Sequence, residues 1–357
     1  MSALYILLAI LIFGFLIFIH ELGHFLAAKL LGVRVNEFSI NMGPKLFGWK
    51  RGETQYSFRL IPIGGYCAME GEDQDTGDPR CFVNAAWWRR LIILCAGSFM
   101  NLLTGFVVVA LLFGFAIPGA MQHTKISSID PASALAEQGV RVGDEIWSID
   151  GKRTYMRVDL DLLEGRFDPA DTELVVVRDG EKVTFEHFRM EKREFDMGNG
   201  EKALLYGISL GVAEPSFSTV NRYAAYQCVD FARMVWYGLS DLVTGRAALK
   251  DVGGVIGAVD VMVQSGEQAK SVSDGIENVL YIGAFLAINL AVMNMLPIPA
   301  LDGGRVLFLL INTVYTAITK KKINPKYEGY IHAGAMILLL ALMAVLLVKD
   351  VIVIAKR

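Results

Sequence analysis

Two histidines and a glutamate near the start of the chain have the spacing of a zinc hydrolase site. His20 and His24 are four residues apart, so on a helix their imidazoles leave the same face about one turn apart. That spacing lets both bind one tetrahedral Zn²⁺ ion. Glu21 follows the first histidine and can act as a general base on a water molecule at the metal. The competing interpretation is a polar helix end whose side chains snorkel toward water.

A catalytic zinc usually has three protein ligands, and Asp302 is the candidate for the third. It follows Pro297 and Pro299 at the end of an apolar stretch. Proline breaks the helical hydrogen-bond ladder, and unwound backbone at membrane depth is tolerated only inside protein or beside water. A broken helix that carries a carboxylate to a metal explains both features. The alternative is a helix stop followed by a Gly-rich turn in which Asp302 is solvated.

The composition places much of the chain in a lipid bilayer. Of 357 residues, 54% are hydrophobic and only 20% are charged, and the mean hydropathy is +0.42. A soluble enzyme of this size is less apolar. The formal net charge of -3, without basic runs interleaved with aromatic residues, excludes a nucleic-acid-binding protein. The four cysteines are scattered and are interpreted as ordinary thiols.

Four stretches without Asp, Glu, Lys or Arg are long enough to cross the bilayer, which takes about 20 helical residues. The first could instead be a secretory signal, but it lacks a basic start and its apolar run is too long. The HELGH motif, His20 to His24, would then lie at the end of the first transmembrane helix. The predicted spans are 1–20, 91–118, 278–301 and 329–348.

Basic residues beside these spans predict the orientation, because cytoplasmic loops carry the excess of Lys and Arg. Segments 25–90 and 303–328 are expected in the cytoplasm, and the N-terminus, the long middle segment and the C-terminus outside. His123 and His187 would then lie across the membrane from the HELGH motif, and they are poor candidates for metal ligands. The basic residues are Arg89, Arg90, Lys320, Lys321, Lys322 and Lys326.

The middle segment divides into a strand-rich part and a helical part. Alternating apolar and polar residues with Asp-Gly turns predict a small β-rich domain over about 122–215. A helix is predicted over 221–243, with a narrow charged face and a broad apolar remainder. Such a helix suits the membrane surface, and packing against the β domain is the alternative. The charged face consists of Arg222, Asp230, Arg233 and Asp241.

Together, these motifs resemble the site-2 protease family, and within it the bacterial regulator-of-sigma-E protease (RseP) type. The resemblance rests on HELGH, on N-x-x-P-x-P-x-L-D-G-G from Asn294 to Gly304, and on a PDZ-like segment between them, 126–151. It implies that His20, His24 and Asp302 bind zinc, that Glu21 is the catalytic base and that Asn294 contacts substrate. Gly97 to Asn101 resembles the G-x-x-x-N motif of the family, which implies that Asn101 helps to hold substrate. Gly97 by itself is interpreted as a site of close helix packing.

The implied fold is a polytopic α-helical membrane protein with about four transmembrane helices and an inserted extracytoplasmic, PDZ-like β domain. The predicted parts are the first half of the protease core (1–118), the PDZ-like domain (119–215), an amphipathic membrane-surface connection (216–277) and the second half of the core (278–357). PDZ domains bind peptides as an added strand and hold a terminal carboxylate in backbone amides. Tyr206 to Ser209 is the candidate carboxylate loop, with a plain strand as the alternative.

A strand-like run, Arg59 to Tyr66, corresponds to the membrane-associated β element of the family. An intact transmembrane helix hides its amides in its own hydrogen bonds, so a protease in the membrane must unwind it. Pairing with a strand edge would do this, and Ile61, Gly64 and Gly65 are the candidate substrate-binding residues. A purely structural hairpin is the alternative.

The resemblance implies an intramembrane zinc metalloprotease of the bacterial inner membrane, with its active site toward the cytoplasm. Its substrates would be single-pass membrane proteins such as anti-sigma factors or remnant signal peptides. A membrane adaptor with a structural zinc is a competing interpretation, and it needs a fourth protein ligand, for which His332 is a candidate. A metallopeptidase on a membrane stalk would carry HELGH in its soluble part, where this chain has no such motif.

Overall fold

A computed structural model describes residues 2–72, 74–196, 201–248, 252–321 and 325–355. They form two compact units, one of residues 1–108 with 235–357 and the other of residues 109–234. Each unit is described by itself. The predicted four-part division of the chain stays a prediction.

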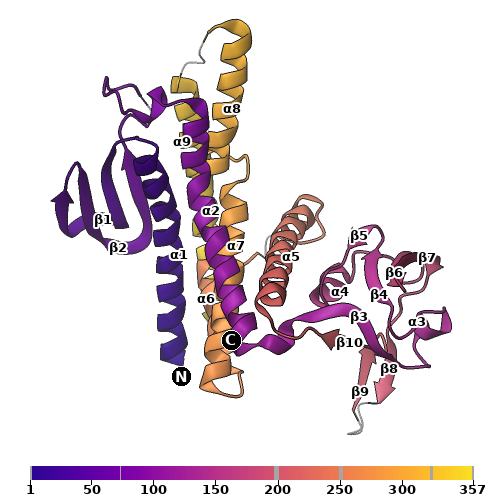
Figure 1. The fold of residues 1–357 in the computed structure, drawn as a ribbon. Coiled ribbons are helices and arrows are strands. Elements are labelled where there is room, and N and C mark those ends of the chain that lie inside the picture. Colours follow the sequence, from indigo (N-terminus) through magenta and orange to yellow (C-terminus); the bar gives the residue numbers. More distant parts are fainter. Residues whose placement is uncertain (1, 73, 197–200, 249–251, 322–324, 356–357) are drawn as a thin grey trace. The chain divides into compact units, whose positions relative to one another are not determined.

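The first unit is helical, with one region of strands (Figure 1). Its helix α2 continues into the second unit, and α5 enters it from there. The helices are α1 (Ser2–Leu30), η1 (Phe82–Asn84), α2 (Trp87–Leu111), α5 (Phe217–Val243), α6 (Val255–Glu267), α7 (Val272–Asn294), α8 (Asp302–Thr319) and α9 (Pro325–Ala355). The strands are β1 (Val35–Arg51) and β2 (Thr54–Met69).

The second unit holds the predicted β-rich domain. Its six-stranded sheet has the order β10-β3-β4-β6-β7, with β5 paired to β4, and β8 and β9 form a separate hairpin. The strands are β3 (Gln122–Ile129), β4 (Glu145–Ile149), β5 (Lys152–Arg153), β6 (Thr172–Arg178), β7 (Glu181–Phe188), β8 (Arg193–Asp196), β9 (Lys202–Leu205) and β10 (Ile208–Val212). The helices are η2 (Leu112–Ala116), η3 (Pro118–Ala120), α3 (Ala134–Glu137) and α4 (Val158–Leu163).

Four helices in the described part of the chain are long and apolar enough to span a membrane, as predicted. They are Ser2–Leu30, Trp87–Ala116, Val272–Asn294 and Tyr327–Ala355. The first corrects one detail, because α1 continues to Leu30 and the HELGH motif lies inside the helix rather than at its end. The length of an apolar run shows which residues prefer hydrocarbon, but it does not show where the helix ends. The helix continues beyond the apolar run where other protein groups satisfy its polar side chains.

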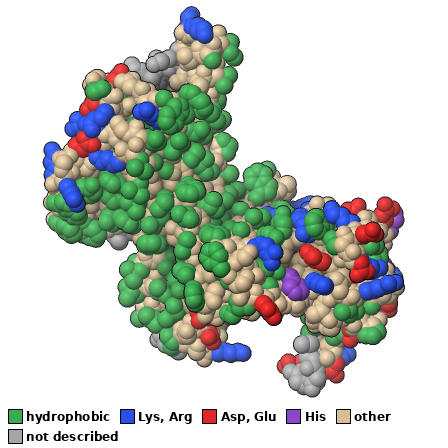
Figure 2. Space-filling view, in the orientation of Figure 1, with side chains coloured by type: hydrophobic (Ala, Val, Ile, Leu, Met, Phe, Trp, Pro, Cys, Tyr) green, Lys and Arg blue, Asp and Glu red, His purple; other side chains and the backbone are tan. Residues whose placement is uncertain are grey.

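The helices α1, α2 and α7 lie side by side and approach closely at small residues (Figure 1). A Cβ added at Gly23 would lie 2.4 Å from the carbonyl oxygen of Ala96, so α1 and α2 touch through backbone there. Gly105 of α2 packs in the same way against Ile288 of α7. Such contacts are typical of helices in membranes, where association depends on close packing. Figure 2 shows hydrophobic side chains gathered over the helices of this unit, as contact with lipid requires.

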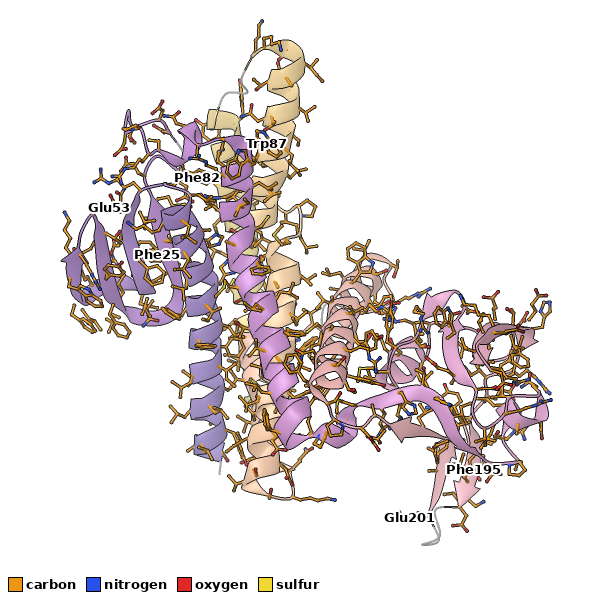
Figure 3. The ribbon with its side chains drawn as sticks, in the orientation of Figure 1. Phe25, Glu53, Phe82, Trp87, Phe195 and Glu201 are labelled. Atoms are coloured by element: carbon orange, nitrogen blue, oxygen red, sulfur yellow. The ribbon has the colours of Figure 1, made fainter. Side chains whose placement is uncertain are left out.

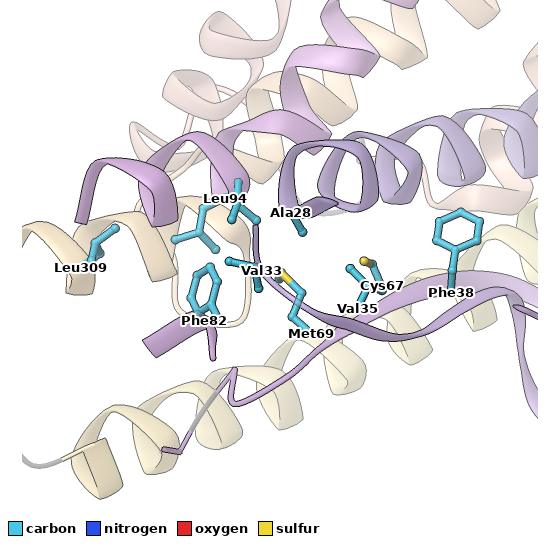
Figure 4. Close-up of a cluster of buried hydrophobic side chains, with 10 residues drawn as sticks. Ala28, Val33, Val35, Phe38, Cys67, Met69, Phe82, Leu94 and Leu309 are labelled. Atoms are coloured by element: carbon cyan, nitrogen blue, oxygen red, sulfur yellow. The ribbon is translucent and has the colours of Figure 1, made fainter. Parts of the chain in front are cut away.

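The strands β1 and β2 form a larger structure than the predicted run of 59–66. The first part of β1 has a segment of β2 on each side, since Glu37 lies opposite both Gln55 and Ala68. Phe25 of α1 packs its ring 5.1 Å from that of Phe38, which joins helix to sheet (Figure 3). Figure 4 shows the core at this junction, made of residues from α1, β1, β2, η1, α2 and α8. Its members are Ala28, Val33, Val35, Phe38, Cys67, Met69, Phe82, Ile93, Leu94 and Leu309.

One residue of the charged face of α5, Asp230, is buried against the β domain, as the packing alternative expects, whereas Arg222 of the same face is exposed. Asp230 and Asp159 are both 0% exposed. Arg233 donates to Asp159 Oδ1 at 2.8 Å and to Asp230 Oδ1 at 3.3 Å. One guanidinium therefore holds two buried carboxyl groups at the contact between α5 and α4. Val229 and Trp236 of α5 are exposed, and the location of this helix at the membrane surface stays a prediction.

The acid pair makes this contact sensitive to pH. Burial raises the pKa of Asp230 to about 8, and the neighbouring charge of Asp159 adds to the rise. An unfolded Asp has a pKa of about 3.9, so between about pH 4 and 8 only the folded state holds the proton. The contact between α5 and α4 therefore becomes less stable as the pH rises from about 4 to about 8, and its stability changes little at higher pH. Asp230→Asn mimics the neutral acid and removes this dependence.

Modification of the buried Cys228 thiol in the full-length protein measures opening of the contact. We expect the wild-type rate, divided by the Asp230→Asn rate at the same pH, to rise from pH 6 to 8 and then to level off. The division cancels the ionisation of the thiol, which both proteins share. A ratio that stays constant from pH 6 to 9 would show that protonation of Asp230 does not stabilise the contact between α5 and α4, and would contradict this prediction.

Candidate metal centre

Helix α1 presents the two histidines on one face, as their spacing predicts. The Nε2 atoms of His20 and His24 lie 3.3 Å apart, and the rings meet edge to face at 4.9 Å between centroids. His24 is buried and His20 is partly buried. The helical period therefore places two imidazole nitrogens at one point beside the helix.

The break between α7 and α8 brings Asp302 to the same point. Helix α7 ends at Asn294, and α8 begins at Asp302 itself, so the prolines interrupt the helix as predicted. Asp302 Oδ2 lies 3.1 Å from His20 Nε2 and 3.2 Å from His24 Nε2. Among the described residues, these three form the one group with the spacing of metal ligands. No fourth protein ligand joins them there, which disfavours the structural zinc of an adaptor.

The geometry of the three atoms suits zinc. At Zn–ligand distances of about 2.0 to 2.2 Å, two ligands of a tetrahedral ion lie roughly 3.3 to 3.5 Å apart, close to the observed 3.1 to 3.3 Å. His24 Nδ1 lies 2.8 Å from the carbonyl oxygen of Ile93 and must donate to it, which leaves Nε2 as a lone pair. Asp302 Oδ2 is buried and accepts no hydrogen bond in the described part of the chain. With neutral imidazoles, lone pairs that converge in this way suit a bound cation.

Gly97 leaves the room that this cluster occupies. A Cβ at Gly97 would lie 2.4 Å from His24 Nε2 and 2.9 Å from His20 Nε2. The sequence interpretation of close packing is correct, but the packed partner is the histidine pair rather than another backbone. No pattern in the sequence distinguishes these two uses of a glycine.

Asn101, predicted to hold substrate, is 0% exposed, and its amide nitrogen lies 3.3 Å from His20 Nδ1. Its Oδ1 has no hydrogen bond within the described residues. Turning the amide over would let Oδ1 accept from Nδ1–H, the tautomer that His20 needs to bind metal through Nε2. Its direct neighbour is therefore the candidate ligand His20, and contact with substrate stays a prediction.

The other predicted site residues are divided between the cluster and the sheet. Asn294 Nδ2 lies 3.4 Å from His20 Nε2, at the partly exposed end of α7. A Cβ at Gly65 would lie 3.3 Å from Glu21 Cγ, so β2 passes directly beside the candidate base. Ile61 and Gly64 instead pack on the opposite part of β1, around Gly43 and Met42.

Two features of the site were not predicted. Arg305 of α8 forms an ion pair with Glu72, in the loop after β2, and so ties the helix of Asp302 to the sheet region. An arginine in the first turn of a helix opposes the helix dipole, which is a signal for such a partner. His332 is not in the ligand cluster, and its Nδ1 accepts a hydrogen bond from the amide of Ala300 at 2.8 Å. His123 and His187 belong to the second unit.

Comparison with known proteins agrees with this site. The model of peptidase family M50 matches residues 8–342. The chain is 35% identical over 359 residues to the candidate zinc metalloprotease CPE1693 of Clostridium perfringens, an alignment that covers 98% of this chain and 99% of that protein. It is 28% identical over 423 residues to the regulator of sigma-W protease RasP of Bacillus subtilis, which covers 96% and 97%. The zinc metalloprotease RasP of Bacillus licheniformis is 28% identical over 430 residues, with the same coverage.

The family model extends over both motifs that carry the candidate ligands. Two of these relatives are named as zinc metalloproteases and the third as a protease. The helices are those of a multi-pass membrane protein. The chain therefore belongs to peptidase family M50, the site-2 protease family, and is a zinc metalloendopeptidase.

Proposed function

We propose that this enzyme hydrolyses peptide bonds within the transmembrane segments of single-pass membrane proteins. The observation that carries the proposal is the position of the site on α1. His20, Glu21 and His24 lie inside a helix of 29 residues whose hydropathy suits the bilayer. Asn101 and Asn294 belong to two further candidate spans. A site built on spanning helices acts on the part of a substrate that enters the membrane.

The edge of the sheet supplies a way to unwind such a substrate. Residues 64–69 of β2 pair with β1 on one side, and their register includes no second partner strand in the described part of the chain. Gly65 of this segment lies against Glu21. An extended substrate added to the edge would exchange its helical hydrogen bonds for sheet hydrogen bonds next to the base. Ile61 and Gly64, on the same strand, would contact the substrate farther along.

The chain's own residues then divide the chemistry. Zinc at His20, His24 and Asp302 supplies a Lewis acid that polarises the scissile carbonyl and acidifies water. Glu21 removes a proton from the attacking water and delivers it to the leaving amine. Asn294, next to His20, donates from its amide to the carbonyl oxygen as charge develops there.

The β unit is proposed to be a PDZ-like domain that selects substrates. Its strand β10 lies at an edge of the sheet and follows Gly207, whose φ of +68° suits a turn of backbone amides. This arrangement supports binding of a peptide C-terminus as an added strand. Exclusion of bulky substrates by size is the second possibility for this unit.

The orientation is proposed from charge. Arg89 and Arg90 begin α2, and Lys320 and Lys321 follow α8, so these ends are assigned to the cytoplasm of a bacterial inner membrane. The N-terminus and the β unit are assigned to the outside. Lys322 lies outside the described residues. The name of one relative, regulator of sigma-W protease, supports an anti-sigma factor as substrate, with remnant signal peptides as the other class.

The test is cleavage in proteoliposomes of a single-pass substrate without its outer domain, with mass spectrometry of the products. We expect a cut within the transmembrane segment and no cut in the same sequence presented as a soluble peptide. Asp302→Asn should lose most of its zinc under mild chelation, because it replaces an anionic carboxylate ligand with a weakly binding neutral amide, and should lose cleavage with it. Cleavage only outside the membrane segment would overturn the proposal, and full zinc in Asp302→Asn would remove this residue from the ligand set.

A further inference from the structure

The loop that delivers Asp302 contains a strained residue. Ala300 has a φ of +79°, in the left-handed region that side chains other than glycine rarely occupy. Strain of this kind persists only where the surroundings impose it. Asp302 follows two residues later, so the conformation at Ala300 determines where the carboxylate begins.

The surroundings impose it through His332. The Ala300 amide donates to His332 Nδ1 at 2.8 Å, across to a different helix, α9. The neighbouring turns of the loop use backbone acceptors instead, as when the Leu301 amide donates to the carbonyl of Ile298 at 3.2 Å. The His332 side chain is 18% exposed, and its ring lies 5.3 Å from that of Phe308 on α8. The imidazole is therefore held by packing as well as by its hydrogen bond.

The loop cannot move without α8. A Cβ on Gly303 would lie 2.3 Å from the carbonyl oxygen of Leu296, and one on Gly304 would lie 2.3 Å from that of Ile298. The first turn of α8 is thus pressed onto the loop backbone. A change in the loop at Ala300 passes directly to Asp302, which lies between that residue and these glycines.

We propose that His332 is a positioning residue for the zinc site, which holds Ala300 in its left-handed conformation and so aims Asp302 at His20 and His24. This inference rests on the proposed role of Asp302 as a ligand. It also gives α9 a function. Few residues of this helix are buried, and His332 joins it to the loop that carries the ligand.

The experiment compares purified full-length variants for zinc loss to a chelator and for cleavage. His332→Leu removes the acceptor and should lose zinc about 10- to 100-fold faster, the usual effect of an outer-shell partner on metal affinity. His332→Asn places its Oδ1 near the position of Nδ1, and it should retain zinc and cleavage within about threefold because it can still accept the amide hydrogen. Adding Ala300→Gly to His332→Leu should partly restore both, since glycine adopts the left-handed conformation without strain.

The variants also separate the possible failures. Tyr330→Leu, at an exposed position of the same helix, should behave as wild type. Wild-type zinc retention in His332→Leu would overturn the positioning role, and equal zinc loss in His332→Leu and His332→Asn would show that an acceptor for the Ala300 amide is not what His332 contributes, which also overturns it. If Asp302→Asn keeps its zinc, Asp302 is not a zinc ligand. The proposed function is then wrong at this residue, and the positioning role of His332 is wrong with it. If His332→Leu does not fold, zinc loss from His332→Asn still decides the result, because retention within about threefold is expected and a loss of about 10-fold or more would overturn the positioning role.

Discussion

Replacing Glu21 with glutamine should reduce peptide-bond hydrolysis by about 10² to 10⁴-fold, the usual contribution of a positioned general base. Glutamine has nearly the same shape as glutamate but cannot take a proton from water. His20, His24 and Asp302, whose ligand atoms lie 3.1 to 3.3 Å apart, are unchanged in this variant. Zinc content should therefore stay at the wild-type level. The measurements are single-turnover cleavage in proteoliposomes and metal analysis of the same preparation.

The matched control for this prediction is Glu277→Gln. Glu277 lies on α7, 17 residues before Asn294, which at 1.5 Å per residue is about 25 Å along the helix from the site. The control makes the same chemical change within the membrane unit and should keep full activity. Retained cleavage in Glu21→Gln would show that another group acts as the base. Loss of zinc together with cleavage would leave the role of Glu21 as a base without support.

Replacing Gly97 with alanine should empty the metal site, although alanine is favourable in a helix. The new Cβ would lie 2.4 Å from His24 Nε2, 2.8 Å from His20 Cε1 and 2.9 Å from His20 Nε2. Contacts this short are not tolerated, so the imidazoles must move apart. A displacement of about 1 Å at a catalytic group can cost roughly 100-fold in rate. We expect at least that loss of cleavage, together with loss of zinc.

Gly14→Ala on α1 is the control for the added methyl group. A Cβ there meets nothing within 4 Å, so zinc and activity should be unchanged. The Gly97 variant should not unfold, because alanine is favoured over glycine by about 1 kcal/mol in a helix interior. Thermal unfolding of both variants checks this point. Normal zinc retention in folded Gly97→Ala would mean that the histidines do not occupy the space beside Gly97.

Local rules were sufficient where the information lies within a few residues. The spacing of His20 and His24 determines that they share a face, because the helical period is a property of the backbone. Pro297 and Pro299 end the helix before Asp302, because proline lacks the amide hydrogen. The sequence motifs therefore predicted three ligand residues, and the structure places all three within reach of one ion, while their role as ligands stays a prediction.

Local rules were insufficient for elements whose stability comes from distant partners. No helix was predicted within 303–328, whereas α8 occupies Asp302–Thr319, where Leu309 joins the core formed with α1 and the sheet. Only the end of the β element, 59–66, was predicted, because β1 derives its stability from a double pairing with β2. The charged face of α5 left membrane-surface contact and packing on the β domain as alternatives, and only the structure shows that Asp230 is buried beside Asp159. The sequence of one helix does not show which distant segment will pack against it.

The sequence by itself determined the chemistry of this protein: two imidazoles, a carboxylate and a base on segments of membrane-spanning length. Only the tertiary structure decided which neighbours make that chemistry possible. Gly97 provides space, Ile93 fixes the tautomer of His24, and Gly65 brings a strand edge to Glu21. The physical reason is that a residue's type states which bonds it can form, whereas packing of remote segments decides which of those bonds it does form.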